Sequence, residues 1–105
     1  MSKNDFIENV TKKLLTLGFS RNNDCWTKKL VQPSNIFING QHFGNNIETD
    51  LSVSIFADAK INDEDAAQML FEAKREGNLI LTYEEIISYN DVDRITTLCH
   101  KIFGI

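Results

Sequence analysis

The side chains best suited to chemistry in this 105-residue chain are two histidines and two cysteines, and their spacing argues against a reaction centre. Cys99 and His100 are adjacent on an expected helix. Neighbouring helical side chains point about 100° apart, so these two cannot share a metal ion or act as nucleophile and base. The chain has neither the CxxC nor the HxxxH spacing of zinc sites, and His42 falls in an expected turn. We therefore expect no metal and no cofactor.

Motifs for phosphate binding and nucleophilic attack are also missing. No serine lies in a GxSxG elbow, and the Gly40–Gly44 spacing lacks the lysine and the following helix of a P-loop. Carboxylates are numerous enough for a general acid/base pair, but helix capping or solvation accounts for most of them. We expect a protein that binds a partner and is not an enzyme.

Charge is distributed unevenly along the chain. Residues 1–47 carry six Lys and Arg against three acidic residues, whereas residues 48–105 carry five against twelve, for a net charge of −4. Such asymmetry can mark a polarised surface. The alternative is that the two halves interleave in space and their fields average out.

A polar row supplies the first candidate binding surface. It recurs every four residues from Glu64 to Glu76 on an expected helix, which would place it on one helix face. Like charges four residues apart mildly destabilise a helix, and a basic partner would reduce their repulsion. The alternative is a solvated face moderated by Lys74 and Arg75. The candidate residues for binding a basic protein are Glu64, Asp65, Gln68, Glu72, Glu76, Asp91 and Asp93.

The outward face of the expected sheet is the second candidate. If Leu51, Val53 and Ile55 face the core, Phe56 must face outward, and the same alternation turns Phe37 outward. Exposed aromatic rings interleaved with lysines are typical of surfaces that stack single-stranded nucleic acid. The chain has no RNP-like motif, and the rings could instead be covered by a helix. The candidates on this face are Trp26, Lys28, Phe37 and Phe56.

Periodicity predicts the elements that position these residues in the first half of the chain. An amphipathic helix is expected from Asn4 to Leu17, ended by Gly18 with Phe19 folding back. Strands are expected at residues 25–31, 35–40 and 50–58, and the second of them ends at the hairpin signal Asn39-Gly40.

The second half is predicted to be mainly helical. A helix is expected to begin at Asn62 and end at Gly77, followed by a short strand at residues 78–81. Thr82 and Glu85 fit a capping box, which predicts a short helix over residues 83–89. A last helix is expected from about Asn90 or Asp91, with its apolar end docked. The expected buried stripes are Ala66, Met69, Leu70 and Ala73, then Val92, Ile95, Leu98, Cys99 and Ile102.

This order of elements predicts one α+β domain over residues 1–105. An antiparallel sheet of three to four strands would pack against an N-terminal helix and two to three C-terminal helices. The chain has no signal-peptide arrangement and no long apolar run, so we expect no membrane segment and a cytoplasmic location. The two cysteines are expected to be reduced, packed thiols.

These features predict a small acidic protein-binding module that blocks a basic or nucleic-acid-handling partner by charge complementarity. Inhibitors, immunity proteins and phage anti-defence proteins share this size and charge, which is an argument by association. The alternative is a nucleic-acid-binding module that uses the basic first half and the aromatic sheet face, although the net negative charge opposes phosphate binding. A structural or oligomeric accessory subunit is the third interpretation. The sequence does not specify an oligomeric state.

Overall fold

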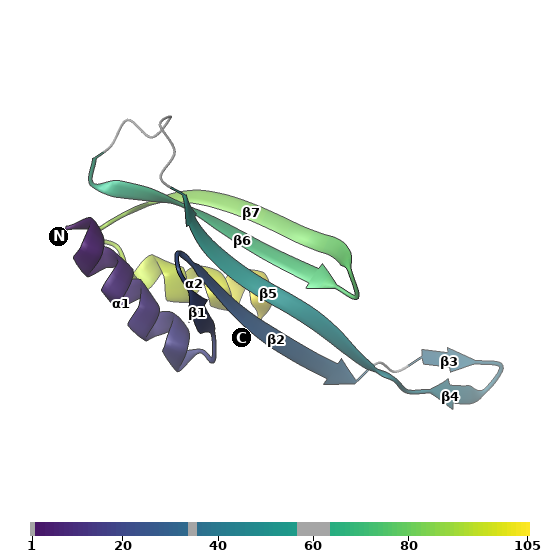
Figure 1. Cartoon of the computed structure of the whole chain (residues 1–105). Coiled ribbons are helices and arrows are strands. Elements are labelled where there is room, and N and C mark those ends of the chain that lie inside the picture. The colour runs from purple at the N-terminus through teal and green to yellow at the C-terminus, as the bar shows by residue number, and fades with distance from the viewer. Residues whose placement is uncertain (1, 34–35, 57–63) are drawn as a thin grey trace.

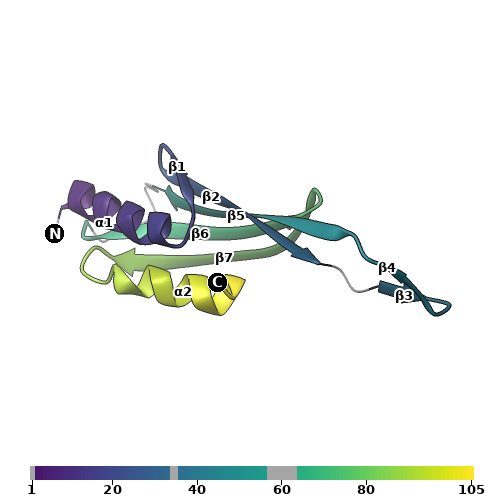
Figure 2. The same ribbon diagram turned by 90° about the horizontal axis from the view of Figure 1, so that it is seen from below.

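The chain folds into one five-stranded antiparallel sheet with two helices packed on the same face (Figures 1 and 2). The computed structural model describes residues 2–33, 36–56 and 64–105, and only the backbone is described for residues 36–38 and 41–43. The elements are α1 (Lys3–Thr16), β1 (Ser20–Asn22), β2 (Cys25–Pro33), β3 (Ile36–Ile38), β4 (Gln41–Phe43), β5 (Asn46–Phe56), β6 (Ala66–Arg75), β7 (Asn78–Ser88) and α2 (Asp93–Phe103).

The sheet has the order β1-β2-β5-β6-β7, so each strand lies beside its neighbour in the sequence except where one hairpin intervenes. That hairpin, β3–β4, connects β2 to β5 and extends past the end of the sheet (Figure 1). Its turn residues Asn39 and Gly40 have φ values of 53° and 76°. Two consecutive left-handed residues are what a two-residue hairpin requires, and the predicted turn is confirmed.

Helix α1 forms as its apolar spacing predicts. The Ser2 hydroxyl accepts a hydrogen bond of 3.2 Å from the backbone N–H of Asp5 and caps the first turn. The helix ends before Gly18, whose φ of +92° favours glycine, and the N–H of Phe19 bonds back to the carbonyl of Leu14 at 3.0 Å. The buried side chains of α1 are Phe6, Val10 and Leu14.

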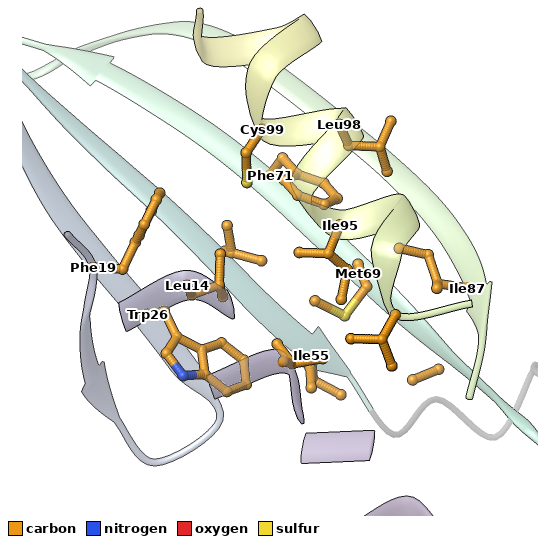
Figure 3. Close-up of a cluster of buried hydrophobic side chains, with 14 of the residues drawn as sticks. Leu14, Phe19, Trp26, Ile55, Met69, Phe71, Ile87, Ile95, Leu98 and Cys99 are labelled. Carbon is orange, nitrogen blue, oxygen red and sulfur yellow. The ribbon is translucent and has the colours of Figure 1, made fainter. Parts of the chain in front are cut away.

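A continuous apolar core fills the space between the sheet and the helices (Figure 3). Leu51, Val53 and Ile55 of β5 are buried in the same core as the side chains of α1, and Phe56 faces the other way, as predicted. Helix α2 contributes Ile95, Leu98 and Cys99 from beneath β6 and β7, and the apolar C-terminal end also packs on the core. The remaining large buried side chains are Phe19, Trp26, Met69, Phe71 and Ile87.

The prediction of three to four strands followed by two to three C-terminal helices is wrong. Residues 66–75 form strand β6 where a helix was expected, and residues 78–88 form strand β7 in place of a short strand and a short helix. The expected helix start at Asn62 lies outside the described residues. Within β6 the buried side chains alternate as Ala67, Met69, Phe71 and Ala73, which is the period of a strand.

The last predicted helix does form. Ile95, Leu98 and Cys99 of the expected stripe are buried in it, Val92 is buried just before its first residue, and Ile102 is partly buried. The left-handed Gly104, with a φ of 69°, ends the helix. Neither helix of the described chain is long and apolar enough to cross a membrane.

Candidate partner-binding surface

The outer face of the sheet, opposite the helices, is covered by none of the described elements (Figure 2). Alternation along β5 turns Ser52, Ser54 and Phe56 toward this face, and Phe56 is 47% exposed. The cross-strand partners of Ser52 on this face are Thr27 and Glu72, and Glu72 in turn lies opposite Thr82. The centre of the outer face is therefore polar.

The predicted acidic residues do not form a helical ridge, because their segment is a strand. Gln68 and Glu72 lie half-buried on the outer face of β6, and Glu76 lies in the β6–β7 turn. Twelve residues of extended chain span roughly 40 Å, so Glu64 and Glu76 lie near opposite ends of the sheet.

The remaining predicted residues gather at the end of the sheet where β6 starts. Glu64 and Asp65 are exposed there, and the carbonyl of Asp65 accepts a hydrogen bond of 2.8 Å from the N–H of Tyr89. Asp91 and Asp93 follow at the start of α2, where Asp93 forms a 2.7 Å ion pair with Lys13 of α1. The seven predicted residues thus fall into two groups and not one patch.

Sequence reasoning missed two acidic residues of β7. Glu84 lies beside the predicted Gln68, whose side-chain amide donates to its carboxylate at 3.0 Å. Glu85 lies on the inner face and receives two hydrogen bonds, of 3.0 and 3.1 Å, from the guanidinium of Arg94. These hydrogen bonds hold the pKa of Glu85 below its ordinary value.

The charge asymmetry of the sequence survives in space. The basic half comprises α1, β1 and β2, at one side of the sheet, and carries Lys3, Lys12, Lys13, Arg21, Lys28 and Lys29. The acidic half comprises β6, β7 and the start of α2, with the residues just before β6 and in the β6–β7 turn, and carries Glu64, Asp65, Glu72, Glu76, Glu84, Glu85, Asp91 and Asp93. Along the sheet the halves stay apart, because the strand order follows the sequence, and they meet below it where Lys13 of α1 pairs with Asp93 of α2.

The aromatic face expected for nucleic acid is not assembled from the described residues. Trp26 is fully buried on the inner face, so its ring cannot stack on a base. Lys28 shares that face, and its ammonium group donates to the carbonyl oxygen of Leu17 at 2.6 Å, which caps the end of α1. Phe56 does face outward, and the side chain of Phe37 lies outside the described residues.

A shallow hollow of about 540 Å³ lies where β1 ends and exposes the edge of β2. Its lining combines hydroxyl and ammonium groups with a single carboxylate, that of Asp50. The polar lining side chains are Ser20, Thr27, Lys28, Lys29, Asp50, Ser52 and Lys74. The hollow thus carries three lysines against one carboxylate, yet no aromatic ring lines it.

The clearest departure from an ordinary surface is on strand β7. Seven large apolar side chains are exposed among the described residues, and four of them belong to this strand. Leu79, Ile80 and Ile86 are each more than half exposed, and Leu81 is 37% exposed. Strand β7 is also the last strand of the sheet, so its outer edge has no described partner. An apolar, unpaired edge is typical of a site where another chain docks.

Of the two cysteines, Cys25 is half-buried and Cys99 is fully buried. Cys25 and Cys99 are both free, and burial raises the pKa of the Cys99 thiol to about 12, so it stays protonated at neutral pH. No three His, Cys, Asp or Glu side chains in the described ranges are grouped closely enough to hold a metal ion.

Comparison with known proteins adds no relative. No family model, no curated protein and no solved structure matches this chain.

Proposed function

We propose that this chain is a small protein-binding module whose acidic half docks onto a basic protein surface. The observation that carries the proposal is the separation of charge across the sheet, because it gives an approaching partner a region where acidic side chains outnumber Lys74, Arg75 and Arg94. The exposed apolar side chains of β7 lie within that same half and supply area that a partner can bury.

Charge complementarity of this kind suits an inhibitor of a nucleic-acid-handling protein. Such a partner carries clustered lysines and arginines where it contacts phosphates, and an acidic surface can occupy them. Blocking of this type needs no catalytic group in the inhibitor. A cytoplasmic location is part of the proposal, and the two free cysteines support it, since a reducing compartment keeps thiols unpaired.

The test is affinity capture from nuclease-treated host lysate, with mass spectrometry of the proteins recovered. The test variant is Glu72→Lys with Glu84→Lys, which reverses two charges on the outer face of the acidic half. The matched control is Glu8→Lys with Asp24→Lys, which changes the net charge equally at exposed positions in the basic half. Exposed charge changes alter stability by less than about 0.5 kcal/mol, which covers Glu8, Asp24 and Glu84. Glu72 is half-buried, so a thermal melt of the test variant must accompany the capture to show that it is folded.

We expect a basic protein that the control retains and the test variant loses, with binding that weakens as salt rises. Recovery of nucleic acid alone, or a partner that ignores both reversals, would contradict the proposal.

A further inference from the structure

We infer that the open edge of β7 accepts an extended basic segment of the partner as a sixth strand of the sheet. This inference rests on the proposed function, because it specifies how the acidic half would hold a basic partner. Its support comes from the backbone groups of the edge, from the contrast with the other edge, and from charge.

The backbone hydrogen bonds show which groups of β7 are free. The N–H of Tyr89 donates to the carbonyl of Asp65 at 2.8 Å, and this pair continues the β6–β7 register. In an antiparallel pair, successive residues point their N–H and C=O groups alternately toward the partner and away from it. Odd-numbered residues from Leu81 onward therefore bond to β6. Thr82, Glu84 and Ile86 direct theirs to the open edge, where no described strand pairs with them. The free edge ends at Ser88, whose carbonyl accepts a hydrogen bond of 2.9 Å from the N–H of Asp91.

The opposite edge of the sheet is protected in the ways that usually prevent strand addition. Strand β1 covers β2 at residues 25–27, and beyond it β2 carries the charged Lys29 and then Pro33, which has no N–H to donate. Strand β7 has neither proline nor lysine along its eleven residues, and its sole irregularity is a bulge near the β6–β7 turn. The edge formed by β7 is therefore better able to pair with an added strand than the edge formed by β1 and β2.

The side chains along β7 favour a strand with alternating apolar and cationic residues. Ile86 is 59% exposed on the outer face, next to Glu84 two residues away. Successive side chains of a strand point to opposite faces. A lysine or arginine of the added strand can therefore reach Glu84 on the outer face and lay its aliphatic stem along Ile86, while its apolar neighbours point to the inner face, where Leu81 is 37% exposed opposite the buried Ala73. On the inner face Glu85 is already paired with Arg94, so the added strand meets no free carboxylate there.

A second copy of the chain fits this edge less well than a basic segment. Antiparallel pairing of β7 with itself about a two-fold axis would bring two acidic halves together. If the axis passed through Glu84, the two carboxylates would lie directly opposite each other, which is destabilising in a sheet. A register shifted by two residues leaves the two Glu84 carboxylates on the diagonal, about 7–8 Å apart, whereas a cationic strand neutralises them.

The test uses a blocked ten-residue peptide that alternates lysine and valine, titrated into the ¹⁵N-labelled protein and followed by NMR. We expect shift changes at the even-numbered residues of β7. A peptide in which every backbone amide is N-methylated has no N–H to donate to the edge from either side, and should bind at least 10-fold more weakly. Equal affinity of the methylated peptide, or shift changes confined to β2, would overturn the inference.

Proline substitution provides the matched protein variants. Thr82→Pro removes an N–H that points to the open edge of β7, and Val31→Pro removes an outward N–H from the edge of β2. Both residues are exposed, and an edge strand tolerates proline where its N–H is unpaired. We expect Thr82→Pro to lower the affinity for the peptide at least 10-fold and Val31→Pro to leave that affinity unchanged. If Thr82→Pro does not fold, the methylated peptide still decides the question.

Failure of this inference and failure of the proposed function give different results. One outcome is a captured partner that no longer binds the charge-reversal variant but binds Thr82→Pro normally. This result would support the proposed function and contradict the addition of a strand. A wild-type dimer in analytical ultracentrifugation that Thr82→Pro dissociates would also overturn it, because the occupant would then be a second copy. Failure to capture any partner would count against the function itself.

Discussion

Two adjacent residues of β6 allow a direct test of whether this segment is a strand. The ring of Phe71 is fully buried, with its centroid 6.2 Å from that of Tyr83 and 6.3 Å from that of Phe103. Leu70 faces the outer side of the sheet and is half-buried. The sequence pattern predicts the reverse, with Leu70 in the buried stripe of a helix and Phe71 outside it.

The burial of each side chain determines how much stability its truncation to alanine should cost. Truncating a buried phenylalanine to alanine costs about 3–5 kcal/mol, which includes the lost ring contacts. Leu70→Ala should cost about 1 kcal/mol, because full burial of a leucine is worth about 1.5–3 kcal/mol and this one is only partly covered. At about 4–8 °C per kcal/mol for a domain near this size, Phe71→Ala should lower the melting temperature by some 12 °C or more, and Leu70→Ala by about 4–8 °C.

The assay is urea denaturation followed by circular dichroism, with thermal melts in parallel. Phe71→Leu is the milder variant, expected to cost about 1–2 kcal/mol, and it gives a measurable transition if Phe71→Ala is too unstable. A Leu70→Ala protein less stable than both Phe71 variants would refute the strand and restore the helix.

Three further predictions follow from single contacts. Lys28→Met should destabilise the fold by about 1 kcal/mol, because the carbonyl of Leu17 loses its charged donor; denaturant midpoints measure this. Arg94 lowers the pKa of Glu85, so wild type should have a larger free energy of unfolding than Glu85→Gln at neutral pH. This difference should disappear as pH falls below the ordinary pKa of 4.5, which denaturant unfolding measured from pH 7 to 3 would show. The Cys99 thiol should resist alkylation at pH 8 until the protein unfolds, as mass spectrometry would show.

The pattern that misled the prediction of β6 is compatible with both kinds of element. Polar residues four apart, such as Gln68 and Glu72, share a face of a helix, but four is also a multiple of two, so they share a face of a strand. Residues with high helix propensity then favoured the helix. Phe71 was the discriminating residue, because a helix would have put its ring among the polar side chains. Burial of that ring between β7 and α2 outweighed local propensity.

A capping-box pattern misled the prediction of β7. Thr82 and Glu85 are three residues apart, which suits a helix start, but on the strand they lie on opposite faces. Glu85 is an acidic residue on the inner face, and it is accommodated there by Arg94 from a helix that begins later in the chain. Sequence periodicity cannot reveal such a long-range partner.

Features determined by local chemistry were predicted well. The glycine that ends α1, the Asn39-Gly40 turn and the alternation along β5 all depend on residues close in sequence, and the structure has each of them. The orientation of Trp26 depends on the register between β2 and β5, where it pairs with the buried Val53. That pairing places both side chains toward the core, and it removed Trp26 and Lys28 from the outer face.

The strand order explains why an uneven sequence becomes an uneven surface. A crossover connection would have placed a strand from the basic half beside one from the acidic half, whereas this sheet keeps the two apart. Strands lie about 4.8 Å apart, so β1 and β7 are separated by roughly 19 Å. The Debye length at physiological salt is about 8 Å, so a partner at β7 is largely screened from the lysine of β2 that faces outward, Lys29. It therefore encounters the local negative charge and not the small net charge of the whole chain.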